Sequence, residues 1–199
     1  MDIRKEVFSN GIMIQLLKSS SYQRMPWKNG LGVTDQIDLA ASEIKSSQPY
    51  AWRLSSALVA ASNPFSIFEG YNRLLSVVEG DGLILNQNPL LPLQVCEFSG
   101  DDHTDCQLIG SPVRDLGLIF NPKTHRARMQ FHTLPNVSES VFSLREEIQF
   151  FYVVQGKMRM AGQTAEAQDC FKLTQETQVK IQNTGSETLG YYQISLSHI

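Results

Sequence analysis

The chain has 199 residues, of which 42% are hydrophobic, so it is long enough to bury a substantial core. Its 17 basic and 20 acidic side chains give a formal net charge of -3, and no Lys/Arg cluster could neutralise the phosphates of a nucleic acid. No segment approaches the roughly 18 apolar residues of a membrane helix. The charged residues 1–6 also lack the apolar core of a signal peptide. Composition therefore predicts a cytoplasmic protein with neither nucleic acid nor a membrane as partner.

The three cysteines, Cys96, Cys106 and Cys170, are widely separated and form no Cys-x-x-Cys pair. An odd number of isolated thiols is typical of reduced, structural cysteines in a cytoplasmic protein.

Short β-type segments separated by turn residues run through the whole chain. Their spacing of roughly 8–12 residues is typical of an antiparallel sandwich or barrel. One weak helical candidate, residues 40–47, precedes Pro49. The expected strands of the first half lie at residues 8–17, 37–41, 50–59, 73–78, 83–85, 93–98 and 115–120, and those of the second at 126–134, 140–144, 149–154, 157–160, 170–173, 178–182 and 189–196.

The stretch Phe65–Leu85 is expected to be a β-hairpin. Both faces of its first strand, residues 73–78, are largely apolar, which indicates an internal strand. Residues 79–82 (Glu-Gly-Asp-Gly) supply turn glycines that tolerate positive φ.

The sequence contains an internal echo at an offset of about 76 residues. Val77-Val78-Glu79-Gly80 aligns with Val153-Val154-Gln155-Gly156, and Phe65-Ser66 aligns with Phe142-Ser143 after a slip of one residue. This favours a duplicated fold of two small barrels. We place the division near Asn121-Pro122-Lys123, with one half at residues 1–121 and the other at 122–199.

The pattern of a strand, a glycine turn and an upstream Phe-Ser segment resembles the first motif of the cupin superfamily. Metal-binding cupins carry His-x-His and a Glu there, but counting back from Gly80 puts Arg73 at the Glu position, and counting back from Gly156 puts Gln149. In the second motif Val179 takes the place of a His. The resemblance therefore implies an all-β bicupin, two antiparallel jelly-roll halves, without the cupin metal centre. We expect no metal and no cofactor.

Within cupins the chain resembles the HutD/Ves bicupins. That family carries Trp-Lys-Asn-Gly-Gly-Gly-x-Thr-Arg-Glu, Trp-Arg-x-Ser, and Pro-Phe-Ser-x-Phe-x-Gly-x-x-Arg leading to Glu-Gly. The corresponding segments here are residues 27–36 (WKNGLGVTDQ), 52–55 (WRLS) and 64–73 (PFSIFEGYNR) with Glu79-Gly80. A later family segment, Asp-Leu-Asn-Leu-Met-x-Arg, appears as residues 115–121 (DLGLIFN). The chain departs from these patterns at Leu31, Asp35, Gln36, Gly117 and Asn121.

Arg73 is the first candidate site residue. An arginine where cupins point a carboxylate into the barrel would offer a two-pronged clamp to an anion. The alternative is a structural arginine satisfied by Glu79, Glu69 or backbone carbonyls. Arg53 is a second candidate clamp, or else a surface charge.

Trp27, Lys28 and Asn29 lie in a glycine-flexed loop that could cover the mouth of a pocket. The alternative places Trp27 as a plug of the barrel end and Lys28 in solvent. If the cupin register holds, the barrel is lined by Ser55, Ser66 and Phe68, which could equally be core packing. Asp115 could orient Arg53 or Arg73, or simply begin a strand.

These residues favour a metal-independent protein, more a binder than an enzyme, that holds a small organic acid. The resemblance implies a role in histidine utilisation or stress response. The rival is a metal-independent isomerase or hydrolase with Lys28 or Glu79 as proton carrier. A third alternative is a partner protein whose barrel is filled by its own side chains. Cupins often pair through strands, so a homodimer is a further expectation.

Overall fold

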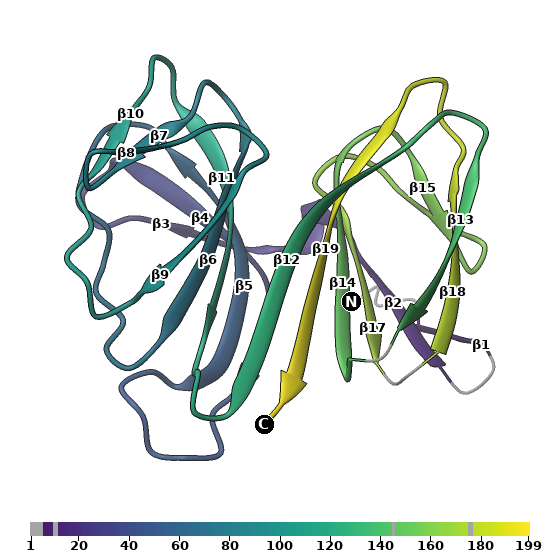
Figure 1. Cartoon of the computed structure of the whole chain (residues 1–199), viewed down its shortest axis with the longest axis horizontal. Coiled ribbons are helices and arrows are strands. Elements are labelled where there is room, and N and C mark those ends of the chain that lie inside the picture. The colour runs from purple at the N-terminus through teal and green to yellow at the C-terminus, as the bar shows by residue number, and fades with distance from the viewer. Residues whose placement is uncertain (1–5, 10–11, 145, 175–176) are drawn as a thin grey trace. The chain divides into compact units, whose positions relative to one another are not determined.

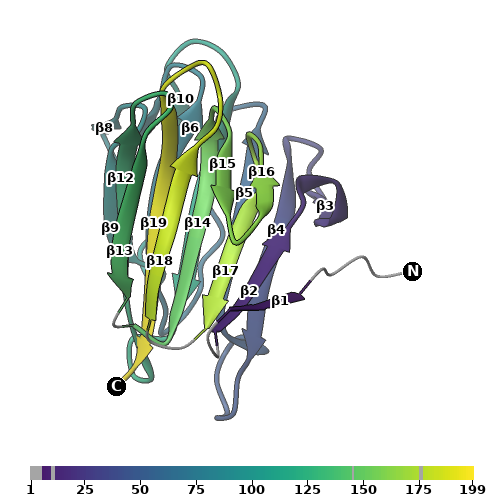
Figure 2. The ribbon, with the colours of Figure 1, turned by 90° about the vertical axis from the view of Figure 1, so that its right-hand side faces the viewer.

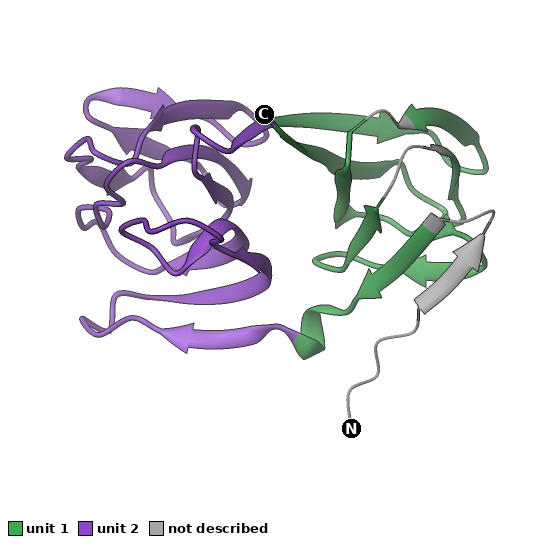
Figure 3. Ribbon diagram, turned by 90° about the horizontal axis from the view of Figure 1, so that it is seen from below, with its two compact units in different colours: residues 1–21, 127–198 green, residues 22–126, 199 purple. Residues whose placement is uncertain are grey.

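The computed structural model describes residues 6–9, 12–144, 146–174 and 177–199. Contacts divide the chain into two compact units (Figure 3), residues 22–126 with Ile199, and residues 1–21 with 127–198. Each unit consists of antiparallel sheets, which confirms the predicted all-β class. The regular helix in the described part of the chain is a single 3-10 turn, η1 (Ser19–Ser21).

The unit of residues 22–126 has a six-stranded sheet in the order β3-β4-β5-β11-β6-β9 and a three-stranded sheet in the order β10-β7-β8 (Figure 1). Its buried core includes Leu75, Val77 and Leu83, all at most 2% exposed. The strand bounds are β3 (Gln23–Pro26), β4 (Gly32–Ala41), β5 (Tyr50–Val59), β6 (Asn72–Glu79), β7 (Leu83–Leu85), β8 (Asn88–Leu90), β9 (Val95–Ser99), β10 (Cys106–Leu108) and β11 (Val113–Phe120).

The other unit has sheets in the orders β1-β2-β17-β14-β19-β12 and β13-β18-β15-β16 (Figure 2). Its core is rich in aromatic side chains, among them Phe151, Phe171 and Tyr191. The strand bounds are β1 (Glu6–Ser9), β2 (Ile12–Leu17), β12 (His125–Leu134), β13 (Glu139–Leu144), β14 (Ile148–Gln155), β15 (Met158–Met160), β16 (Gln163–Ala165), β17 (Cys170–Thr174), β18 (Thr177–Asn183) and β19 (Leu189–His198).

The two units repeat one strand order. The run β11-β6-β9 in one sheet has its counterpart in β19-β14-β17, and β10-β7-β8 has its counterpart in β18-β15-β16. Gly80 after β6 and Gly156 after β14 both have a left-handed backbone, with φ of 98° and 83°. The echo seen in the sequence thus marks equivalent strand ends in the two units.

The hairpin expected within Phe65–Leu85 is wrong. β6 pairs with β11 and β9, whereas β7 pairs with β10 and β8, so the glycine turn carries the chain from one sheet to the other. A Cβ on Gly80 would lie 2.9 Å from the Pro112 carbonyl oxygen, so the crossing has no room for a side chain. The expectation that residues 73–78 form an internal strand is confirmed, since β6 has a neighbour on each side.

The helical candidate at residues 40–47 is also wrong. β4 continues to Ala41, and the chain then loops back so that the Ser42 N–H donates to the Pro49 carbonyl at 3.1 Å. Ser42 and Ser46 donate their hydroxyls to the carbonyls of Ile44 and Gln48. Serine hydroxyls that bond to nearby backbone compete with a helix, which explains the irregular loop.

The described residues before Tyr22 belong to the unit of residues 127–198, a division that differs from the expected halves 1–121 and 122–199. β2 pairs with β17, with Leu17 opposite Cys170 and Ile14 opposite Leu173, and so covers an edge of the sheet (Figure 2). An uncovered edge would leave a row of backbone donors and acceptors unpaired.

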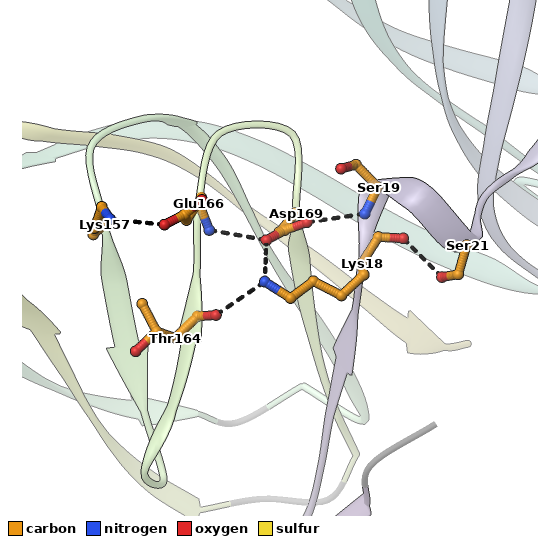
Figure 4. Close-up of polar contacts among 7 residues, drawn as sticks. All are labelled: Lys18, Ser19, Ser21, Lys157, Thr164, Glu166 and Asp169. Atoms are coloured by element: carbon orange, nitrogen blue, oxygen red, sulfur yellow. Dashed lines mark hydrogen bonds and ion pairs between the residues drawn. The ribbon is translucent and has the colours of Figure 1, made fainter. Parts of the chain in front are cut away.

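Asp169 ties this N-terminal segment to its sheet (Figure 4). Its carboxylate accepts hydrogen bonds from Lys18 Nζ at 2.7 Å and from the backbone N–H groups of Ser19 and Glu166 at 2.9 Å each. The Asp169 side chain is only 6% exposed. This buried carboxylate therefore joins Lys18 and Ser19 to the turn at residues 166–169, about 150 residues away in sequence.

We expect Asp169→Ala to lower the free energy of unfolding by about 2–3 kcal/mol, because it leaves buried donors without an acceptor. Urea unfolding followed by circular dichroism measures the change. The matched control is Glu166→Ala, which removes only the exposed ion pair with Lys157, so little change is expected there (Figure 4). Equal losses for the two variants would contradict the assigned role of Asp169.

Candidate functional site

A cavity of about 500 Å³ opens within the unit of residues 22–126. Its floor is the face shared by three neighbouring strands, β5, β11 and β6. Because successive strand side chains point to opposite faces, alternate residues of each strand reach the cavity. The floor residues are Arg53, Ser55 and Ala57 of β5, Arg73 and Leu75 of β6, and Asp115, Gly117 and Ile119 of β11.

The cavity wall comes from two loops outside these strands. One carries Trp27, Lys28 and Asn29 before β4, and the other is the irregular segment of residues 63–68 between β5 and β6. All the site residues predicted from the sequence line this one cavity: Trp27, Lys28, Asn29, Arg53, Ser55, Ser66, Phe68, Arg73 and Asp115. That they bind a ligand stays a prediction.

Arg73 is held by aromatic rings. Its guanidinium carbon lies 4.7 Å from the ring centroid of Phe65, 4.9 Å from that of Phe98 and 5.4 Å from that of Phe68. Stacking of this kind fixes a guanidinium while leaving its N–H donors free. Desolvation by burial lowers the pKa of Arg73 to about 10, with Asp115 acting in the opposite direction, so the side chain stays charged at neutral pH.

The structural alternative for Arg73 finds little support in its surroundings. Its hydrogen bond to protein is a long one, 3.5 Å from Nη1 to the Ser66 carbonyl. Glu79 instead lies 3.9 Å from Arg114 Nε. Within the described ranges, no carboxylate lies within 4.0 Å of the Arg73 guanidinium.

Arg53 lies against the same aromatic wall. Its guanidinium carbon is 5.2 Å from the ring centroid of Tyr50 and 5.5 Å from that of Phe68. Its Nε is buried without a hydrogen-bond partner, and no carboxylate of the described residues is within ion-pair distance. Two guanidinium groups therefore share the Phe68 ring and the cavity beside it.

Asp115 is 6% exposed and lies on the same floor. Its Oδ1 accepts the Ala57 N–H at 3.0 Å. Burial raises the pKa of this carboxyl to about 7, and the Ala57 N–H, Arg73 and Arg114 oppose that rise only in part. Asp115 makes no direct ion pair with Arg53 or Arg73, and it acts on Arg73 through space.

The loop of residues 27–32 is a tight turn. The Trp27 N–H donates to the Gly32 carbonyl at 2.9 Å, and the Trp27 indole N–H donates to Thr34 Oγ1 at 2.8 Å. Asn29 Oδ1 accepts the Leu31 N–H at 3.0 Å, so this amide oxygen shapes the turn. Lys28 is exposed at the rim.

Gly32→Ala is expected to lower the free energy of unfolding by about 2 kcal/mol through overpacking. The new Cβ would lie 2.6 Å from the Leu58 carbonyl oxygen and 2.7 Å from the Trp27 ring. Gly117→Ala is the control, since its Cβ would make an ordinary 3.5 Å contact with Leu75. Urea unfolding and acrylamide quenching of tryptophan fluorescence report the loss and the displaced indole. Equal stability of both variants would contradict this account.

Sequence reasoning missed several residues of the site, above all Phe65 and Phe98, which stack on Arg73. It also missed Ala57, Gly117 and Ile119 on the floor. Every second residue of a strand lies on the same face, so counting in twos along the chain from Arg53 and from Asp115 could have identified these floor residues. Nothing local could have identified Phe98, because β9 meets β6 only in the sheet.

The positions that hold a metal in other cupins carry no metal-binding set here. In the part of the chain that the structure describes, no group of three or more His, Cys, Asp or Glu side chains could hold a metal ion. In the acidic loop before β10, Asp101 accepts hydrogen bonds from the Gly70 N–H and the Ser99 hydroxyl, and His103 lies 3.2 Å from Asp105 at the surface. No helix among the described residues has the length and apolar character to cross a membrane.

Comparison with known proteins shows clear relatives. The family model HutD matches residues 19–190. A protein of Pseudomonas aeruginosa PAO1 of unknown function, PA5104, is 30% identical in its crystal structure, with a TM-score of 0.80 over 92% of this chain and 98% of that one. HutD from Pseudomonas fluorescens SBW25, in a formate condition, is also 30% identical, with a TM-score of 0.77 over 94% and 99% of the two chains.

An uncharacterized 21.2 kDa protein in the hutC 3′ region of Pseudomonas putida is 42% identical over 123 residues. That match spans 59% of this chain and 64% of the relative, less than two thirds of the relative's length. These matches confirm the predicted bicupin fold. The chain belongs to the HutD family.

Proposed function

We propose that this protein binds a small carboxylate-bearing metabolite in the cavity of residues 22–126, with Arg73 as the principal clamp and Arg53 as the second. The observation that carries the proposal is the pair of guanidinium groups at one cavity. Both have their carbon within 5.5 Å of the Phe68 centroid, and neither is paired with a carboxylate of the described residues.

The energetic argument is one of charge compensation. Two like charges that share a desolvated space raise each other's free energy. Desolvation by burial is the main reason that the pKa of Arg73 is lowered, and the nearby charge of Arg53 lowers it further. An anion between them would relieve this repulsion and accept charge-assisted hydrogen bonds. A carboxylate matches the planar fork of arginine.

The cavity also limits the kind of ligand. A volume of about 500 Å³ suits a small metabolite, and the aromatic wall offers an apolar surface beside the charged floor. Phe65 and Phe68 supply that wall, while the exposed Lys28 and Asn29 lie at the mouth. Such a cavity argues against a barrel filled by its own side chains in this unit.

The relatives support a role in histidine utilisation. One solved relative is named HutD, and the curated relative lies in the hutC 3′ region. We therefore propose that the protein acts in the cytoplasm and that its ligand is a small acid of histidine utilisation. The alternative is a role in stress response.

The test is calorimetric titration of the full chain with urocanate and formylglutamate, each beside its neutral amide. Formate serves as the smallest carboxylate probe. We expect the acids to bind and the amides to give no heat, because only a charged group compensates the two arginines. The proposal fails if none of the acids binds, or if each amide binds as tightly as its acid.

A further inference from the structure

Asp115 has one carboxylate oxygen that the fold leaves unused. Oδ1 accepts the Ala57 N–H, and the Asp115 backbone carbonyl accepts the Ser56 hydroxyl at 2.7 Å. Within the described ranges, no donor lies within hydrogen-bonding distance of Oδ2. The side chain nevertheless lines the cavity. This oxygen can therefore still accept a hydrogen bond or a proton from a molecule in the cavity, which makes Asp115 a candidate for chemistry.

The charges around Asp115 suit a group that exchanges protons at neutral pH. Burial raises its pKa to about 7, which is where a base is most effective in cells. Arg73 on β6 and Arg114 on β11 lower that pKa, but Arg114 is engaged by Asp35 at 3.1 Å. Cys106 on β10 is a further titratable neighbour, and burial raises its thiol pKa to about 12, so it stays neutral.

Strand register sets the distance between the base and the clamps. Arg53 and Arg73 both lie opposite Ile119 of β11, one on each side. Asp115 is four residues back along the same strand, about 13 Å between backbones at roughly 3.3 Å per residue. Arg73 nevertheless acts electrostatically on the Asp115 carboxyl across this separation.

The floor between clamps and base is open. Gly117 lies midway and has no side chain, and a Cβ there would find its nearest atom, Leu75 Cδ1, at 3.5 Å. A small acid held at the arginine end can therefore extend over Gly117 toward Asp115.

We propose that this cavity catalyses proton transfer at the carbon next to the keto group of a 2-oxo acid, with Asp115 as the base. This step rests on the carboxylate site proposed above, since Arg73 must hold the acid. It goes beyond binding and differs from the rival with Lys28 or Glu79 as proton carrier. Glu79 does not line the cavity, and Lys28 lies at its exposed rim.

The step balances without an oxidant or a second reactant. The C3–H bond of the substrate breaks and its proton moves to Asp115 Oδ2. The electron pair moves into the C2 carbonyl and forms an enolate, whose oxygen the terminal N–H groups of Arg53 stabilise. Return of the proton to C3 restores the 2-oxo acid, and its return to oxygen gives the enol.

The experiment is hydrogen–deuterium exchange at C3 of pyruvate and 2-oxoglutarate in D₂O, followed by ¹H NMR with the full chain. We expect wild-type protein to exchange these protons faster than buffer, and Asp115→Asn to lose about 100-fold of that rate. Asn keeps the acceptor for the Ala57 N–H, so pyruvate affinity by calorimetry should stay within about threefold. Asp105→Asn, an exposed carboxylate of the same unit, should exchange as wild type does.

Exchange no faster than buffer with both acids, or equal exchange by Asp115→Asn and wild type, overturns the proton-transfer step. Calorimetry on the same samples separates this from failure of the binding site. If acids bind without exchange, the carboxylate site stands and only the assignment of Asp115 as a base is wrong.

Discussion

Raising the pH from about 4 to about 8 is expected to lower the contribution of Asp115 to the free energy of unfolding by up to about 4 kcal/mol. The pKa of Asp115 rises from 3.8 to about 7 on folding, chiefly because the carboxyl is buried. Between these values the folded chain holds a proton that the unfolded chain has lost. The stabilisation is therefore complete below pH 3.8 and is lost as the pH rises through about 7.

The difference between wild type and Asp115→Asn isolates this contribution. Asn cannot ionise, so the variant should match wild type only below about pH 3.8 and exceed it by about 4 kcal/mol near pH 8, with roughly 2.6 kcal/mol of that difference developing between pH 5 and pH 8. Groups common to both proteins cancel, including His132, whose pKa is lowered by burial and which acts with the opposite sign. Urea unfolding at pH 5, 6, 7 and 8 provides the curves. Parallel curves would contradict the raised pKa.

Arg73→Ala is expected to weaken urocanate binding by about 100-fold, or about 2.7 kcal/mol. The substitution removes the charge and the two-pronged donor from the aromatic cradle of Phe65, Phe68 and Phe98. Arg73→Lys keeps the charge but loses the planar fork, so we expect an intermediate loss of about tenfold. Calorimetry gives both affinities.

Arg126→Ala is the matched control for net charge, since Arg126 is exposed in the same unit and lies outside the cavity. Its urocanate affinity should equal that of wild type. A lysine variant that binds as tightly as wild type would show that Arg73 supplies only charge. An alanine variant with unchanged affinity for urocanate would show that Arg73 takes no part in binding.

Much of the candidate site could be predicted from short-range patterns. Motif spacing brought Trp27, Arg53 and Arg73 into one hypothesis, and the structure places all three at one cavity. This worked because strand side chains alternate with a fixed period, so an arginine in a known register has a known direction.

Predictions that depended on strand partners were less successful. Glycines at 80 and 82 suit a hairpin as well as a crossing between sheets, and only the pairing of β7 with β8 and β10 decides between them. The pairing of residues 12–17 with β17 likewise depends on a contact between distant parts of the chain, which local sequence does not specify. Local propensity carries no information about which distant edge a strand will meet.

The sequence by itself determined the all-β class, the duplicated pattern and the presence of arginine where other cupins place a metal-binding carboxylate. Periodicity and spacing along the chain carry these features. Only the tertiary structure decided that Arg53 and Arg73 share the Phe68 ring, and that Asp115 is buried with a pKa near 7. Burial, electrostatic coupling and cavity shape depend on strands that meet from distant parts of the chain, and such properties do not exist before the sheets form.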